Sequence, residues 1–181
     1  MFMNYALSIN GFEVINGYSD VLTPLLGGVR AAAGATGWWG NLRWFSLSRF
    51  LPEVEGGRSP VIRYLSNHLI NRITFAERQA CAEIAPEINN HLTHDEEYEG
   101  GHPERSNEVL QSWEALAVLN EELVTGDEEE NLSLWTNKLE LAKETYLKLS
   151  TRGITLDYRS NFDHIEPLVE GIEAFKKSAE I

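Results

Sequence analysis

The chain contains a single cysteine, Cys81, which excludes an internal disulfide and a zinc site built from several cysteines. No apolar run approaches the ~20 residues that a membrane-spanning helix requires. The first residues also lack the basic segment and following apolar segment of a secretory signal. From these absences we expect an intracellular, cytoplasmic protein that does not bind a membrane.

Positive charge is scarce as well, with 15 Lys and Arg against 28 Asp and Glu, and the formal net charge is −13. The imbalance lies in residues 77–131, which we call the acidic segment: it carries sixteen acidic residues and only two basic ones, Arg78 and Arg105. Because binding to a phosphate backbone requires clustered Lys and Arg, we expect no direct nucleic-acid binding. The excess of negative charge is more than solubility needs and indicates a basic protein partner.

A chain of 181 residues with 43% hydrophobic content can bury a substantial core as one domain. Most of its apolar residues recur with a helical period, but residues 7–14 and 154–158 alternate as strands do. Two lone strands are most stable when they pair with each other. We therefore predict a mostly α, single-domain helical bundle over residues 1–181, with a small two-stranded β element that pairs the N- and C-terminal regions.

Several helix boundaries can be predicted from local signals. Ser59 before Pro60 predicts a helix through about residue 73, and Thr74 with Glu77 forms a capping box that opens a helix to about residue 94, kinked at Pro86. Three further helices are expected, from Ser106 to about residue 126, from Asn131 or Ser133 to about residue 153, and from Asn161 or Asp163 onward.

Within the helix expected from Thr74, four potential metal ligands recur every four residues: Glu83, Glu87, His91 and Asp95. Groups at this spacing share one helix face and can bind one ion, and His102, after the Gly100–Gly101 turn, can fold back as a further ligand. This pattern predicts an alternative function, a metal-dependent enzyme of the non-haem-iron kind that holds iron, manganese or zinc. The other interpretation is that these polar groups face water beside the core and that there is no cofactor.

A short stretch resembles a known family of metal enzymes. Leu92, Asp95, Glu96, Gly100, His102, Pro103 and Glu104 are similar to the acidic and His-Pro stretch of haem-oxygenase-like di-iron oxidases. That resemblance implies a second helix downstream with two histidines and a carboxylate, whereas this chain has only Asp163 and His164 there. We do not assign the chain to that family.

Besides the potential metal ligands, a second candidate site is a cluster of aromatic residues between Gly37 and Phe45. This cluster holds three of the five tryptophans. Aromatic residues beside arginine are typical of an interface or a base-stacking platform, so Trp38, Trp39 and Arg43 are candidates for partner binding. The alternative is that these tryptophans fill the core. Residues 23–28 and 40–44 together resemble the N-terminal part of repeat-associated RNA-binding proteins of CRISPR effector complexes. The strand pattern of that fold is missing, and the acidity opposes RNA binding.

The third candidate is the acidic surface itself, and it supports the function that we favour. We expect an acidic interaction protein, such as an accessory subunit, an inhibitor or a nucleic-acid mimic, that acts through the carboxylate-rich face of residues 77–131. The sequence assigns no catalytic residue and no oligomeric state. The carboxylates expected to contact the partner are Glu96, Glu97, Glu99, Glu104 and Glu108.

Overall fold

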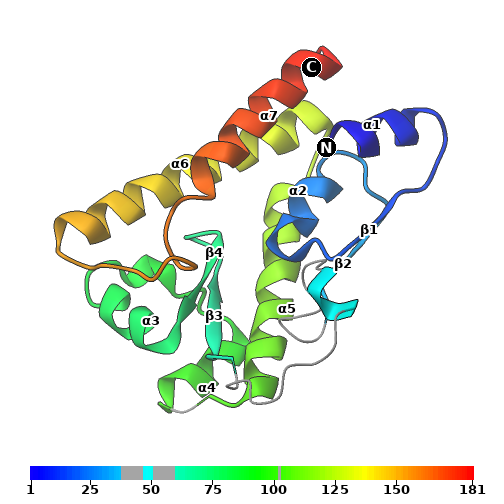
Figure 1. Cartoon of the computed structure of the whole chain (residues 1–181). Helices are drawn as coiled ribbons and strands as arrows, with labels where there is room; N and C mark the ends of the chain where they lie inside the picture. The colour runs from blue at the N-terminus through cyan, green and yellow to red at the C-terminus, as the bar shows by residue number, and fades with distance from the viewer. Residues whose placement is uncertain (38–46, 51–59, 102) are drawn as a thin grey trace.

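The computed structural model describes residues 1–37, 47–50, 60–101 and 103–181 (Figure 1). This part of the chain is mostly α-helical and contains two small sheets of two strands each, so the predicted fold class is confirmed. Within it, no helix combines the length and the apolar character needed to span a lipid bilayer. Two long helices form the frame, α5 (Arg105–Leu123) and α6 (Glu128–Thr151), and α7 (Ile165–Ala179) runs beside α6.

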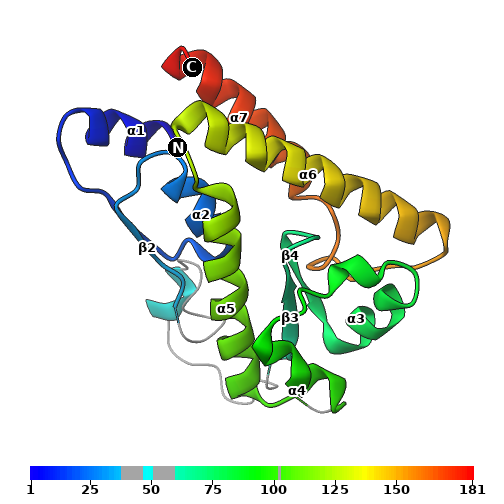
Figure 2. The same cartoon turned by 180° about the vertical axis from the view of Figure 1, so that it is seen from behind.

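The smaller elements lie on the two sides of α5 (Figures 1 and 2). One side carries the hairpin β3 (Arg63–Ser66) and β4 (Asn71–Thr74), followed by α3 (Phe75–Ala82) and the short α4 (Glu96–Glu99). The other side carries α2 (Thr23–Gly27), β1 (Ile15–Gly17) and β2 (Ala33–Ala35), while α1 (Phe2–Ile9) lies near the end of α7. Short 3₁₀ turns complete the described chain: η1 (Asp20–Leu22), η3 (Leu47–Phe50), η4 (Pro86–Ile88) and η5 (Thr93–Asp95).

Strand pairing is local in both sheets. β1 pairs in parallel with β2, with Ile15 opposite Ala33, and β3 pairs antiparallel with β4, with Arg63 opposite Thr74. The predicted pairing of the N- and C-terminal regions is therefore wrong: residues 7–9 belong to α1, and residues 154–158 form an irregular segment. Ile154 and Leu156 still pack against the core. Their alternation reports a half-buried extended chain, which does not require a strand partner.

The β3–β4 hairpin occupies residues for which the sequence predicts a helix. Tyr64, Leu65 and Ser66 are all buried, so β3 presents no solvent face that would reveal its period. The outer edge of β3 has no partner strand among the described residues. Side chains form hydrogen bonds with the backbone groups on this edge instead. The Gln111 side-chain amide accepts from Leu65 N–H at 3.0 Å and donates to Leu65 C=O at 2.9 Å. The Tyr98 hydroxyl donates to Arg63 C=O at 2.8 Å.

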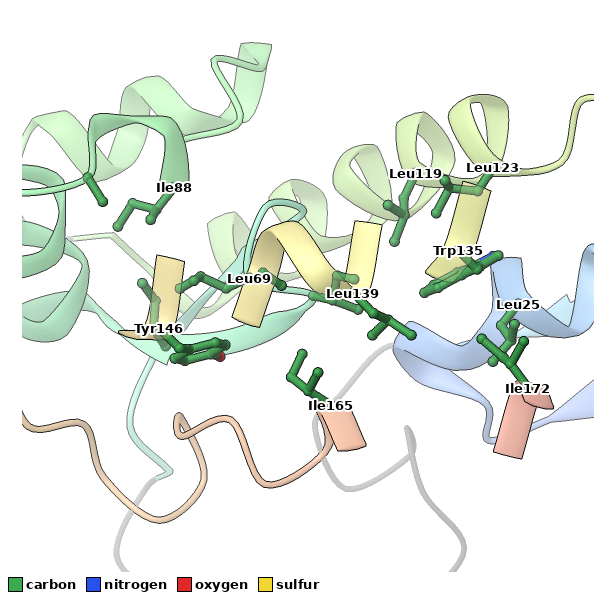
Figure 3. Close-up of a cluster of buried hydrophobic side chains, with 14 of the residues drawn as sticks. Leu25, Leu69, Ile88, Leu119, Leu123, Trp135, Leu139, Tyr146, Ile165 and Ile172 are labelled. Atoms are coloured by element: carbon green, nitrogen blue, oxygen red, sulfur yellow. The ribbon is translucent and has the colours of Figure 1, made fainter. Parts of the chain in front are cut away.

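The core is formed by one large cluster of buried side chains that extends from α2 to α7 (Figure 3). Trp135, Leu139 and Tyr146 of α6 lie at its centre, with α5, α7 and the hairpin around them. The helical periods of α5, α6 and α7 are confirmed, with first residues that differ from the expected ones by one to five positions. These long helices are the elements whose apolar spacing is most informative.

The capping box at the start of α3 is confirmed. Thr74 Oγ1 accepts from Glu77 N–H at 3.3 Å, and Glu77 Oε2 accepts from Thr74 N–H at 2.7 Å. The same carboxylate accepts from the Ser160 hydroxyl and from Asp157 N–H, each at 2.7 Å. Glu77 thus fastens the segment before α7 to the start of α3.

Helix α3 ends at Ala82, so the helix expected to continue to about residue 94 is wrong. The physical reason is Pro86, which disfavours helical geometry in the residue before it. Ala85 accordingly has φ −134° and ψ 75°, and the chain continues as the separate turn η4.

Replacing Thr74 with alanine should lower the free energy of unfolding by about 1 kcal/mol, because the N–H of Glu77 loses its capping oxygen. Urea denaturation of the wild type and of Thr74→Ala measures the difference. Thr155→Ala is the matched control, since the exposed Thr155 makes no side-chain hydrogen bond to a described residue and should change stability little. Equal stability of Thr74→Ala and wild type would contradict the capping role.

Glu77 should also give the fold a dependence on acidic pH. Burial alone raises its pKa, but hydrogen bonds from Asp157, Thr74 and Ser160 outweigh burial and hold the pKa below the ordinary 4.5. A lowered pKa means stability that is complete above pH 4.5 and is lost as pH falls through the lower, folded-state value. The stability difference between wild type and Glu77→Gln should therefore shrink below pH 4.5. Glu83→Gln, at an exposed position just after α3, should follow the wild-type profile.

Candidate functional site

A pocket of about 240 Å³ opens beside α4, within the acidic segment. Its walls come from α3, from the irregular segment after η4, and from α4 itself. The lining includes four residues that the sequence singles out, His91, Asp95, Glu96 and Glu99, together with Arg78 and Asn89. It is the place in the described chain where candidates from the metal and the partner hypotheses meet.

Arg78 is the unexpected residue of this pocket. It projects from α3, is only 7% exposed, and lies against two tyrosine rings, with Cζ 4.8 Å from the Tyr64 centroid and 5.7 Å from the Tyr98 centroid. The two rings meet edge to face at 5.2 Å. Cation–π contact of this kind compensates part of the lost hydration of a buried guanidinium. Arg78 nevertheless forms no ion pair with any described residue, and its Nε–H is buried without an acceptor.

Asp95 has a structural role beside this arginine. It is 4% exposed, and its Oδ2 accepts a hydrogen bond from the Tyr64 hydroxyl at 2.7 Å. That hydroxyl in turn accepts from Asn90 N–H at 2.6 Å. Burial, with a further contribution from the Asp95 carboxylate, raises the pKa of Tyr64 well above its ordinary value, so the phenol remains a hydrogen-bond donor. The chain Asn90–Tyr64–Asp95 fixes the segment that leads into α4.

The predicted metal ligands do not share a helix face. Glu83 is exposed just after α3, Glu87 lies in η4 and pairs with Lys148 at 2.9 Å, and His91 is an exposed residue with φ +56°. The Asp95 carboxylate already accepts a hydrogen bond from the Tyr64 hydroxyl. Among the described residues, no group of three or more His, Cys, Asp or Glu side chains is placed to hold a metal ion. The face predicted from the spacing is therefore wrong because the helix ends early, and His102 lies outside the described residues.

The predicted partner-binding carboxylates divide into two groups. Glu96, Glu97 and Glu99 are exposed on α4, and Glu104 is exposed at the N-cap of α5. Glu108 is only 4% exposed and pairs with Arg105 at 2.6 Å, so it does not belong to the exposed face. Trp38, Trp39 and Arg43 lie outside the described residues.

Many other carboxylates of the acidic segment serve the fold rather than a surface. Each of them accepts a hydrogen bond or forms an ion pair with a residue of another element or at a helix start: Glu77 with residues 157 and 160, Glu87 with Lys148, Glu114 with the N–H groups of Thr93 and His94, Glu122 with Lys138, Asp127 with the N–H of Glu130, and Glu128 with Arg30. The negative charge is therefore not one continuous face. Two compact groups of exposed carboxylates remain, one at α4 and the start of α5, and one at the start of α6 with Glu129 and Glu130.

Sequence reasoning missed Arg78 and the two tyrosines. One signal was present, because Arg78 is one of only two basic residues in the acidic segment and stands three positions before the buried Cys81 on the same helix. That spacing places both residues on one face.

Comparison of the chain with protein-family models, with curated proteins and with solved structures gives no match. The pocket and the exposed carboxylates around it are therefore the features of this chain from which a function can be inferred.

Tyr64→Phe should lower the free energy of unfolding by about 1–3 kcal/mol, because the buried Asp95 carboxylate and the Asn90 N–H each lose a partner. Urea denaturation measures the loss. Tyr158→Phe removes a hydroxyl from a tyrosine that is 75% exposed and should change stability little. If the two substitutions have equal effects, the Tyr64 hydroxyl does not hold the segment.

Proposed function

We propose that this protein is an acidic interaction protein that binds a basic protein partner through Glu96, Glu97, Glu99 and Glu104, which we call the α4 face. Such a protein would act as an accessory subunit, an inhibitor or a nucleic-acid mimic. The observation that carries the proposal is the concentration of these four exposed carboxylates within nine residues, while Glu108 and many other carboxylates of the acidic segment are internally paired.

Little positive charge compensates the α4 face within the described chain. The nearest ion pair joins His94 Nδ1 to Glu97 Oε2 at 3.8 Å, and the nearby Arg105 is engaged with Glu108 and with the Pro60 carbonyl. The carboxylates of Glu96, Glu97 and Glu99 share a single helical turn and repel one another, so they do not stabilise each other. This arrangement does create a local negative potential, which steers a basic partner and speeds its association.

The α4 face is also held in a defined position. Tyr98, on the opposite side of α4, is buried and donates its hydroxyl hydrogen bond to β3. Asp95, immediately before α4, is fixed by Tyr64. A four-residue helix anchored at both of these points presents its carboxylates with little freedom left to lose, which reduces the entropic cost of binding.

The test compares two variants of equal net charge. One carries Glu→Gln at the four residues of the α4 face, and the control carries Glu→Gln at exposed positions of α6 and α7: Glu140, Glu144, Glu170 and Glu173. Figure 1 shows these helices at the end of the molecule away from α4. A partner captured at low salt by the wild type should be lost with the α4 variant and retained with the control. Both variants should melt near the wild-type temperature, since exposed charges contribute little to stability.

Equal loss of capture in both variants would show that only net charge matters and would remove the α4 face from the argument. Capture that ignores added salt would contradict the electrostatic basis of the proposal, because contacts between exposed charges are screened within about 10 Å at 0.1 M ionic strength.

A further inference from the structure

Two buried polar atoms in the wall of the α4 pocket have no hydrogen-bond partner in the described chain. One is the Nε donor of Arg78, and the other is the Oδ1 acceptor of Asn89. Buried donors and acceptors in folded proteins are nearly always satisfied by protein, water or a bound ligand. Because both atoms are themselves buried, they lie behind the pocket surface, and the group that the pocket leaves without a partner is the guanidinium of Arg78, which is 7% exposed and forms no ion pair with a described residue.

The charges around the pocket narrow the chemistry of that ligand. A guanidinium is well suited to a carboxylate, to which it can donate two parallel hydrogen bonds. A purely anionic ligand would meet the exposed carboxylates of Glu96 and Glu99 at the same opening. A purely cationic ligand would leave Arg78 without an acceptor. The arrangement therefore favours a ligand with a carboxylate at one end and a cationic nitrogen at the other.

The net charge and the size of the pocket narrow the chemistry of the ligand further. Three carboxylates, those of Asp95, Glu96 and Glu99, line the pocket together with one guanidinium, so a zwitterion with an additional positive charge is favoured over a neutral one. The volume of about 240 Å³ lies below the roughly 300–1,000 Å³ of sites for drug-sized ligands and suits a single amino-acid residue.

We propose that the pocket binds a basic amino acid with a free α-carboxylate, lysine or arginine, either as the free amino acid or as the C-terminal residue of a peptide. The α-carboxylate pairs with Arg78, and the side-chain cation pairs with Glu96 and Glu99. This site shares two residues with the α4 face, but it does not require a protein partner.

The test begins with the unmodified protein and ligands that lack one group each. L-Lysine and L-arginine should bind in calorimetric titration. L-Lysinamide, without the carboxylate, and L-norleucine, without the side-chain cation, should each bind roughly tenfold or more weakly, the loss expected for one charge-assisted hydrogen bond. Gly-Gly-Lys with a free C-terminus, compared with its C-terminal amide, tests the peptide as the source.

Variants then separate this pocket from the α4 face as a whole. The double variant Glu96→Gln/Glu99→Gln should weaken lysine binding roughly tenfold or more, whereas Glu97→Gln/Glu104→Gln, at positions outside the pocket lining, should leave it unchanged. Arg78→Met should remove the discrimination between lysine and lysinamide, and circular dichroism checks that this buried variant folds. The two double variants carry the same net charge, so they also control for general electrostatics.

Each outcome has a definite meaning. Binding of Gly-Gly-Lys without binding of free lysine assigns the site to peptide C-termini, and the reverse assigns it to the free amino acid. Lysinamide binding as tightly as lysine would overturn the inference, because acidic attraction alone would then explain the affinity. Failure of lysine, arginine and Gly-Gly-Lys to bind would also overturn it, while leaving capture of a basic partner by the α4 face intact.

Discussion

The outer edge of β3 is the constraint on which the end of the molecule that carries the α4 pocket depends. A buried strand must satisfy its backbone N–H and C=O groups, and in the part of the chain that the structure describes β3 has a partner strand on one side only. Side chains supply the rest: Gln111 brackets Leu65, Asn90 donates to the same carbonyl at 2.7 Å, and Tyr98 reaches the carbonyl of Arg63. These bonds join α5, the segment after η4, and α4 to a single strand.

The pocket follows from that edge. Because β3 is held in place, Tyr64 points its hydroxyl at Asp95, and its ring, together with that of Tyr98, forms the surface against which Arg78 lies. Tyr64, which belongs to the strand, and Tyr98, which hydrogen-bonds to its edge, therefore also bury the arginine. The exposed carboxylates on α4 are therefore positioned by hydrogen bonds to the backbone of β3, and not by the helix propensity of four residues.

This dependence explains how much could be predicted from the sequence. The long helices α5, α6 and α7 and the capping box at Thr74 rest on contacts within a few residues, and these predictions are confirmed. The β3–β4 hairpin was missed because β3 is buried on every side and its edge partner, Gln111, is 46 residues away. The prediction that Glu83, Glu87, His91 and Asp95 share one helix face was wrong for a local reason, because Pro86 prevents the helix from continuing through these residues. Glu108 was misplaced on the surface although its i,i+3 spacing from Arg105 is one at which ion pairs form along a helix.

Net charge on its own does not distinguish carboxylates that hold a fold from carboxylates that face a partner. In this chain the distinction comes from the donors around each group: Glu77 has two N–H donors and a hydroxyl, whereas Glu96 and Glu99 have no cation within ion-pair distance among the described residues. Directly beside those two carboxylates lies a buried guanidinium that lacks an acceptor. A negative rim over a positive wall is a dipolar arrangement, and its attraction depends on how the bound group is oriented. An acidic surface alone would attract any cation, but the arginine beside it restricts the site to ligands that bring a carboxylate in the matching position.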